Sequence, residues 1–84
     1  MSLCVGTLSR AGIKADKDGD AVAKLKSSGA IPLLVSNTPE ICLDWQTSNF
    51  ITGRTNNPYD TSRTTGGSSG GEVVISVKII YQHC

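Results

Sequence analysis

Hydrophobic positions near the start of the chain predict a short helix followed by a buried strand. Val22 and Leu25 stand three residues apart and mark one apolar face of a helix near residues 19–28. Gly29 is placed to end this helix. The continuous apolar segment 31–35 carries a proline at its second position and is typical of a buried parallel strand. A helix, a glycine and a buried strand form half of an α/β crossover.

A second short helix is predicted near residues 39–44. Thr38 offers a capping hydroxyl, and Pro39 suits the first helical position. The segment 46–65 that follows is polar and rich in turn residues, so it predicts a long loop. A loop of this length in a small domain is more often functional or disordered than a plain connection. The aromatic side chains next to this helix, Trp45 and Phe50, are expected to pack in the core.

The last dozen residues carry two patterns that disagree. Ser69 and Glu72 have the spacing of a capping box, which predicts the start of a helix. Residues 73–81 alternate at period two and are rich in β-branched side chains, which predicts a strand. Local signals in conflict are atypical of a continuous optimised fold. We therefore divide the chain into residues 1–72 and a divergent hydrophobic tail, 73–84.

Composition and charge exclude several classes of protein. The chain has 84 residues, enough for one small domain, and 8 basic residues balance 7 acidic ones. This balance does not supply the basic surface that nucleic acid requires. No apolar run approaches the ~20 residues of a membrane-spanning helix, and the start lacks the features of a signal peptide.

The cysteines predict neither a metal site nor a set of disulfides. Cys4, Cys42 and Cys84 are odd in number and far apart, which favours reduced thiols in an intracellular setting. Cys42 is expected to pack against apolar neighbours rather than to react. The alternating acids at 16–20 resemble the start of a calcium loop, but no glutamate follows at the twelfth position. We predict no metal and no cofactor.

The strongest chemical signal is the run from Gly66 to Glu72, in which two hydroxyls stand between pairs of glycines. The hydroxyls belong to Ser68 and Ser69, and the glycines are Gly66, Gly67, Gly70 and Gly71. Glycine permits unusual backbone angles and a close approach of substrate to the main chain. If the serines precede a helix, its free N–H groups favour negative charge beside them. The run therefore predicts a catalytic hydroxyl.

Three other interpretations of this run are weaker. A flexible Gly/Ser linker needs neither the symmetry nor the closing acid. A nucleophile elbow over residues 66–70 needs a strand before it and a downstream acid and histidine, for which only Glu72 and His83 are available. A phosphate-binding loop would carry a lysine after its second glycine, and none is present.

Four blocks of sequence resemble the amidase-signature hydrolases. The blocks cover residues 25–33, 36–40, 53–60 and 63–72, and the resemblance as a whole runs from about residue 6 to residue 72. Within that family the chain is most similar to the type-2 fatty-acid amide hydrolases. The resemblance implies a partial, incomplete α/β amidase-signature domain and hydrolysis of amide bonds in small lipid amides.

The resemblance also assigns roles to the serines. The family's catalytic set is a nucleophilic serine, a lysine, and a bridging serine that follows a cis peptide bond. Ser68 matches the bridging serine, with Gly67–Ser68 as the cis link, and Ser69 and the four glycines match its supporting residues. A bridging hydroxyl can pass a proton between nucleophile and base, because it donates one hydrogen bond while it accepts another.

The rest of the catalytic set has no match in this sequence. Lys14 and Lys17 lie in a polar segment that does not fit the family's lysine motif, and no second Gly–Gly–Ser motif follows residue 72. We therefore expect a fragment with no amidase turnover of its own. The resemblance leaves membrane association and homo-oligomerisation of the complete enzyme open. The alternative is a non-catalytic product that associates through a strand at 73–81.

The polar loop before the serines is expected to have a mainly structural role. Asn and Asp favour turn positions, where they hydrogen-bond to nearby backbone. This applies to Arg54, Asn56, Asn57 and Asp60, and Asn37 is likewise expected to fix a loop.

Overall fold

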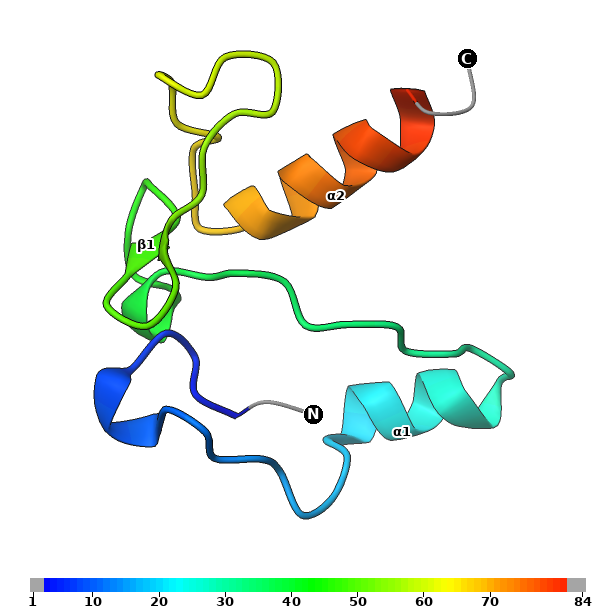
Figure 1. Cartoon of the computed structure of the whole chain (residues 1–84). Coiled ribbons are helices and arrows are strands. Elements are labelled where there is room, and N and C mark those ends of the chain that lie inside the picture. Colours follow the sequence, from blue (N-terminus) through cyan, green and yellow to red (C-terminus); the bar gives the residue numbers. More distant parts are fainter. Residues whose placement is uncertain (1–2, 82–84) are drawn as a thin grey trace.

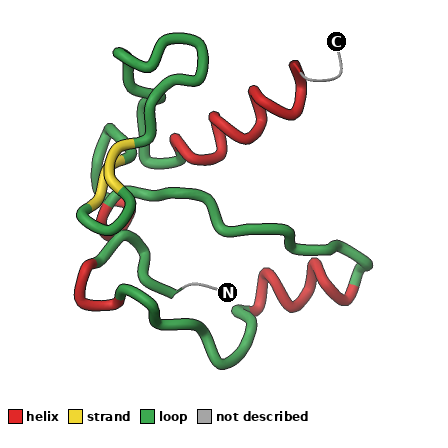
Figure 2. The backbone as a smooth tube through the Cα atoms, in the orientation of Figure 1, coloured by secondary structure: helices red, strands yellow, loops and turns green. Residues whose placement is uncertain are grey.

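The computed structural model describes residues 3–81, and most of this backbone is loop (Figure 2). The helices are α1 (Asp20–Ser27) and α2 (Gly70–Tyr81), with short 3-10 turns η1 (Leu8–Arg10) and η2 (Glu40–Cys42) and the two strands β1 (Ser48–Asn49) and β2 (Gly53–Arg54). In Figure 1 a long extended segment after α1 runs back towards β1 and separates α1 from α2.

Helix α1 confirms the predicted first helix. Asp20 lies in its first turn and Lys26 in its last, which suits the helix dipole. Gly29 (φ 93°) ends the helix in a Schellman motif, because its N–H donates to the Lys26 carbonyl and the Ala30 N–H donates to the Leu25 carbonyl, both at 3.0 Å. The local cap residues thus determine the end of this element.

The predicted strand at 31–35 is wrong. The segment is extended but pairs with no strand, and Leu33 is 85% exposed. Within residues 3–81 the one sheet is the antiparallel pair β1–β2, in which Ser48 faces Arg54 and Asn49 faces Gly53. An apolar run signals that a segment is suited to burial, and the described residues provide no neighbouring strand to bury it.

The predicted helix at 39–44 is also wrong, since only the turn η2 forms. Ile41 (φ 53°) and Cys42 (φ 58°) adopt left-handed backbone angles that an α-helix excludes. The Ile41 N–H instead donates to the carbonyl of Val5 at 2.9 Å, which joins the turn to the N-terminal segment. Cys42 is exposed rather than packed.

Helix α2 replaces the strand predicted for 73–81. The N–H of Val73 donates to the Ser69 carbonyl at 3.2 Å, so the helix begins at the position that the capping signal predicts. The carboxylate of Glu72, however, accepts a hydrogen bond from the Ser36 hydroxyl (2.5 Å) rather than capping the helix. Val73 and Val77 lie four residues apart and share a face in a helix as well as in a strand, so the pattern does not discriminate.

The described residues form no apolar core. The fully buried side chains are those of Thr47 and Pro39, and no hydrophobic side chain among residues 3–78 is buried. Trp45 is 92% exposed and Phe50 83%, so the expectation that they pack in a core is wrong. No helix in the described part is long and apolar enough to cross a membrane.

Candidate functional site

The serines lie on a short connection, the Gly/Ser loop (residues 66–69), which leads directly into α2. The Gly67–Ser68 peptide bond is cis, as the resemblance implies. Gly66 (φ 77°) has the left-handed angle that glycine adopts readily. Ser68 is half-buried and Ser69 is exposed. The loop thus presents Ser68 immediately before the first turn of a helix.

A fully buried hydroxyl, that of Thr47, holds the Gly/Ser loop at both ends. It accepts a hydrogen bond from the Gly70 N–H at 2.8 Å. Its proton faces the carbonyls of Gly66 (3.1 Å) and Ser68 (3.3 Å), which share it. Nothing in the local sequence marks this residue, because its partners lie 19 to 23 positions further along the chain.

Close packing explains three of the four glycines. A Cβ on Gly67 would lie 2.8 Å from the backbone of Asp44, and one on Gly71 would lie 2.5 Å from the backbone nitrogen of Asn37. A Cβ on Gly70 would collide with the hydroxyls of Thr47 and Thr65. The loop is therefore packed against its surroundings, in contrast to a flexible linker.

An open hollow of about 600 Å³ borders Ser68. Its lining combines apolar and polar groups and consists of Cys42, Leu43, Asp44, Trp45, Gly66, Gly67 and Ser68. Within residues 3–81 no hydrogen bond engages the Ser68 hydroxyl, so this group can both donate and accept. The lining contains no lysine and no second serine.

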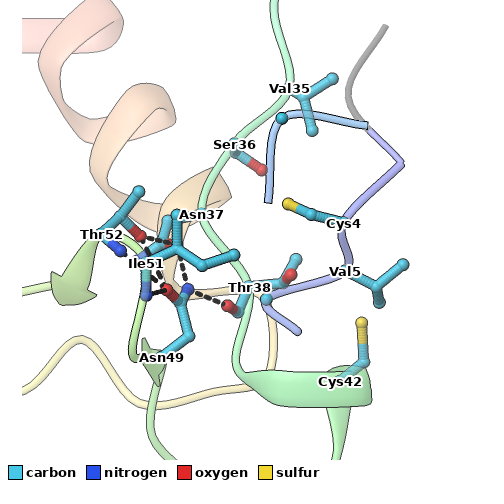
Figure 3. Close-up of a pocket in the computed structure, with 12 residues that line it drawn as sticks. Cys4, Val5, Val35, Ser36, Asn37, Thr38, Cys42, Asn49, Ile51 and Thr52 are labelled. Carbon is cyan, nitrogen blue, oxygen red and sulfur yellow. Dashed lines mark hydrogen bonds between the residues drawn. The ribbon is translucent and has the colours of Figure 1, made fainter. Parts of the chain in front are cut away.

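A second pocket, of about 530 Å³, is bounded on one side by a network of amides and hydroxyls (Figure 3). The Asn37 side-chain oxygen accepts hydrogen bonds from Asn49 and Thr52, both at 2.7 Å, and its nitrogen donates to the Thr55 hydroxyl at 2.8 Å. This confirms the loop-fixing role expected for Asn37. The sequence reasoning missed Asn49, which also donates to the Thr38 carbonyl at 2.7 Å.

Side chains fix the polar loop after β2 at three of the four predicted residues, and Asn56 instead forms a backbone bridge with Thr64. Arg54 donates to the Ser62 carbonyl at 3.3 Å, and the side chain of Asn57 accepts from the Tyr59 N–H at 2.9 Å. Asp60 accepts from both the hydroxyl (2.6 Å) and the N–H (3.0 Å) of Ser62. These bonds, together with one from Arg63, lower the pKa of the Asp60 carboxyl.

Residues 3–81 contain no group of three or more His, Cys, Asp or Glu side chains that could hold an ion.

Comparison with known proteins identifies the class of the protein. The sequence model of the Amidase family matches residues 1–78, so the chain belongs to this family. The match continues past Glu72 into α2.

Several curated relatives are similar to this chain. It is 49% identical over 67 residues to human fatty-acid amide hydrolase 2, an alignment that covers 80% of the chain and 13% of that protein. It is 47% identical over 58 residues to fatty acid amide hydrolase 1 of Caenorhabditis elegans, covering 69% of the chain and 10% of the relative. The vitamin D3 hydroxylase-associated protein of Gallus gallus is 41% identical over 75 residues, covering 82% of the chain and 16% of the relative. The chain thus spans only a small part of each relative.

Proposed function

We propose that this chain supplies Ser68 as the bridging serine of an amide-hydrolysing site that acts on fatty-acid amides. The observation that carries the proposal is the placement of Ser68 on a packed loop, beside an open hollow and two residues before the first residue of α2. Membership of the Amidase family and the similarity to human fatty-acid amide hydrolase 2 support the reaction class and the substrate class.

The chemistry assigned to Ser68 is proton transfer. A serine hydroxyl is a weak nucleophile until a base removes its proton, and a lysine becomes such a base when burial keeps it neutral. In the proposed site the Ser68 hydroxyl accepts a proton from the nucleophilic serine and donates its own to the lysine. The reverse transfer delivers a proton to the leaving nitrogen. General acid–base action of this kind contributes about 10²–10⁴-fold to the rate.

Residues beside Ser68 suit a substrate with an acyl chain. Leu43 and Trp45 line the same hollow and are 82% and 92% exposed, so apolar surface is available next to the hydroxyl. Burial of each methylene of an acyl chain contributes about 0.8 kcal/mol. The nucleophile and the lysine belong, in this proposal, to parts of the enzyme outside the matched blocks.

Association through a strand at 73–81 is not proposed as a second function. It depends on an alternating edge strand, and residues Gly70–Tyr81 form α2.

A chimera tests the proposal. Residues 6–72 of this chain would replace the matched stretch of human fatty-acid amide hydrolase 2, and hydrolysis of a long-chain primary amide would be measured. We expect the chimera to be active and Ser68→Ala to lower kcat by about 10²–10⁴-fold. Ser28→Ala is the matched control. Ser28 follows α1 and is exposed, and its hydroxyl donates only to the Lys24 carbonyl. An inactive chimera, or a Ser68→Ala chimera as fast as the control, would contradict the proposal.

A further inference from the structure

We infer that Thr47 is a positioning residue, whose buried hydroxyl fixes the main chain on both sides of Ser68 and thereby sets the place of the Ser68 hydroxyl. This inference rests on the proposed function of Ser68. Thr47 has no exposed surface and does not line the hollow beside Ser68, so it acts through the loop rather than on a substrate.

The hydrogen bonds of Thr47 require a group that is both donor and acceptor. The oxygen accepts from the Gly70 N–H, which is one of the free donors in the first turn of α2. The hydroxyl donates to the carbonyls of Gly66 and Ser68, which share its proton. A single hydroxyl therefore joins the start of the helix to the residues before and at Ser68. A valine has the same shape but supplies neither function.

The main chain of Thr47 is itself fixed. Its carbonyl accepts a hydrogen bond from the Thr55 N–H at 2.8 Å, next to the β1–β2 pair. Gly70 completes the fit, since a Cβ there would collide with the Thr47 hydroxyl. The Gly/Ser loop is consequently held against the β1–β2 region, and the hydroxyl of Thr47 makes a shorter hydrogen bond in this link (2.8 Å, from the Gly70 N–H) than the hydroxyl of Thr65 does (3.3 and 3.4 Å).

Loss of this link has a defined kinetic consequence. A bridging hydroxyl works only within hydrogen-bond distance of two partners, about 2.6–3.2 Å from each. A displacement on the order of 1 Å can cost about 10²-fold in rate. Because Thr47 lies outside the hollow, substrate binding is affected less than turnover. We therefore expect kcat to fall while KM changes little.

The test uses three variants of the chimera that carries residues 6–72. Thr47→Val should lower kcat by about 10–100-fold with KM within about twofold, and Thr47→Ser should restore most of kcat because it keeps the hydroxyl. Thr65→Val is the matched control, since the Thr65 hydroxyl reaches the Thr55 and Gly66 carbonyls only at 3.4 and 3.3 Å. Its effect on kcat should be smaller than that of Thr47→Val.

Amide hydrogen exchange gives a readout that does not depend on activity. Exchange is measured in the intact chimera and read out in the fragment that covers residues 66–72. Thr47→Val should speed exchange of the Gly70 amide, and Thr47→Ser should not. Unchanged exchange together with unchanged kcat in Thr47→Val would overturn the inference, and so would Thr47→Ser being as impaired as Thr47→Val. If Thr47→Val does not fold, the kcat of Thr47→Ser tests the inference by itself. A kcat near that of the unmodified chimera supports the inference, and a kcat lower by 10-fold or more overturns it.

The two proposals fail in different ways. If the unmodified chimera is inactive, or if Ser68→Ala has no effect, the function proposed for Ser68 fails, and hydrogen exchange at Gly70 still tests whether Thr47 fixes the loop. If Ser68→Ala is strongly impaired while Thr47→Val is unchanged in kcat and exchange, only the role of Thr47 fails.

Discussion

Gly71→Ala probes the packing of α2 against the segment that precedes η2. Gly71 is buried, and a Cβ there would lie 2.5 Å from the backbone nitrogen and 2.6 Å from the backbone oxygen of Asn37. Ordinary contact begins near 3.4 Å, so this backbone must move by almost 1 Å. Backbone cannot rotate away as a side chain can, and the shift would disturb the hydrogen bond that Asn37 accepts from Asn49 and the one that it donates to Thr55.

The magnitude follows from two opposing effects. Overpacking costs about 1–3 kcal/mol, and replacing glycine by alanine within a helix returns about 1 kcal/mol. We expect a net destabilisation of up to about 2 kcal/mol in the chimera, measured as a lower urea midpoint with an unchanged m-value. Gly19→Ala is the control, because nothing lies within 4 Å of its added Cβ and its φ of −67° is one that alanine adopts readily. Equal midpoints for the two variants would refute the packing argument.

Two further predictions concern the chain itself. The isolated chain should show a broad, weakly cooperative thermal transition and should bind a hydrophobic dye, because no hydrophobic side chain among residues 3–78 is buried. A sharp calorimetric peak without dye binding would contradict this prediction. The Asp60 carboxyl should titrate below its ordinary pKa of 3.8, chiefly because the Ser62 hydroxyl and N–H stabilise its charged form, with a smaller effect of Arg63. Because the pKa of Asp60 is lower in the folded state, its contribution to stability is complete above pH 3.8 and is lost as the pH falls through the folded-state pKa. An NMR titration of Asp60 with a midpoint at or above 3.8 would refute this prediction.

The elements that the sequence predicts correctly depend on local interactions. Helix α1 ends at Ser27, and Gly29 closes it through main-chain bonds within a few residues; α2 begins where the spacing of Ser69 and Glu72 indicates. Such signals are complete within the segment that carries them.

The elements that the sequence predicts wrongly depend on distant partners. The apolar segment 31–35 needs a neighbouring strand, and the described residues offer none. The helix expected at 39–44 is replaced by a turn with left-handed Ile41, an angle that β-branched residues rarely adopt. Thr47 is missed because its hydrogen-bond partners lie 19 to 23 residues away, and no local pattern records such a contact.

The most direct measurement is the ratio of kcat between the unmodified chimera and its Ser68→Ala variant on a long-chain primary amide. If the Ser68 hydroxyl carries the proton between the nucleophile and the lysine, the ratio is about 10²–10⁴. A ratio near one would show that proton transfer proceeds without Ser68 and would contradict the account.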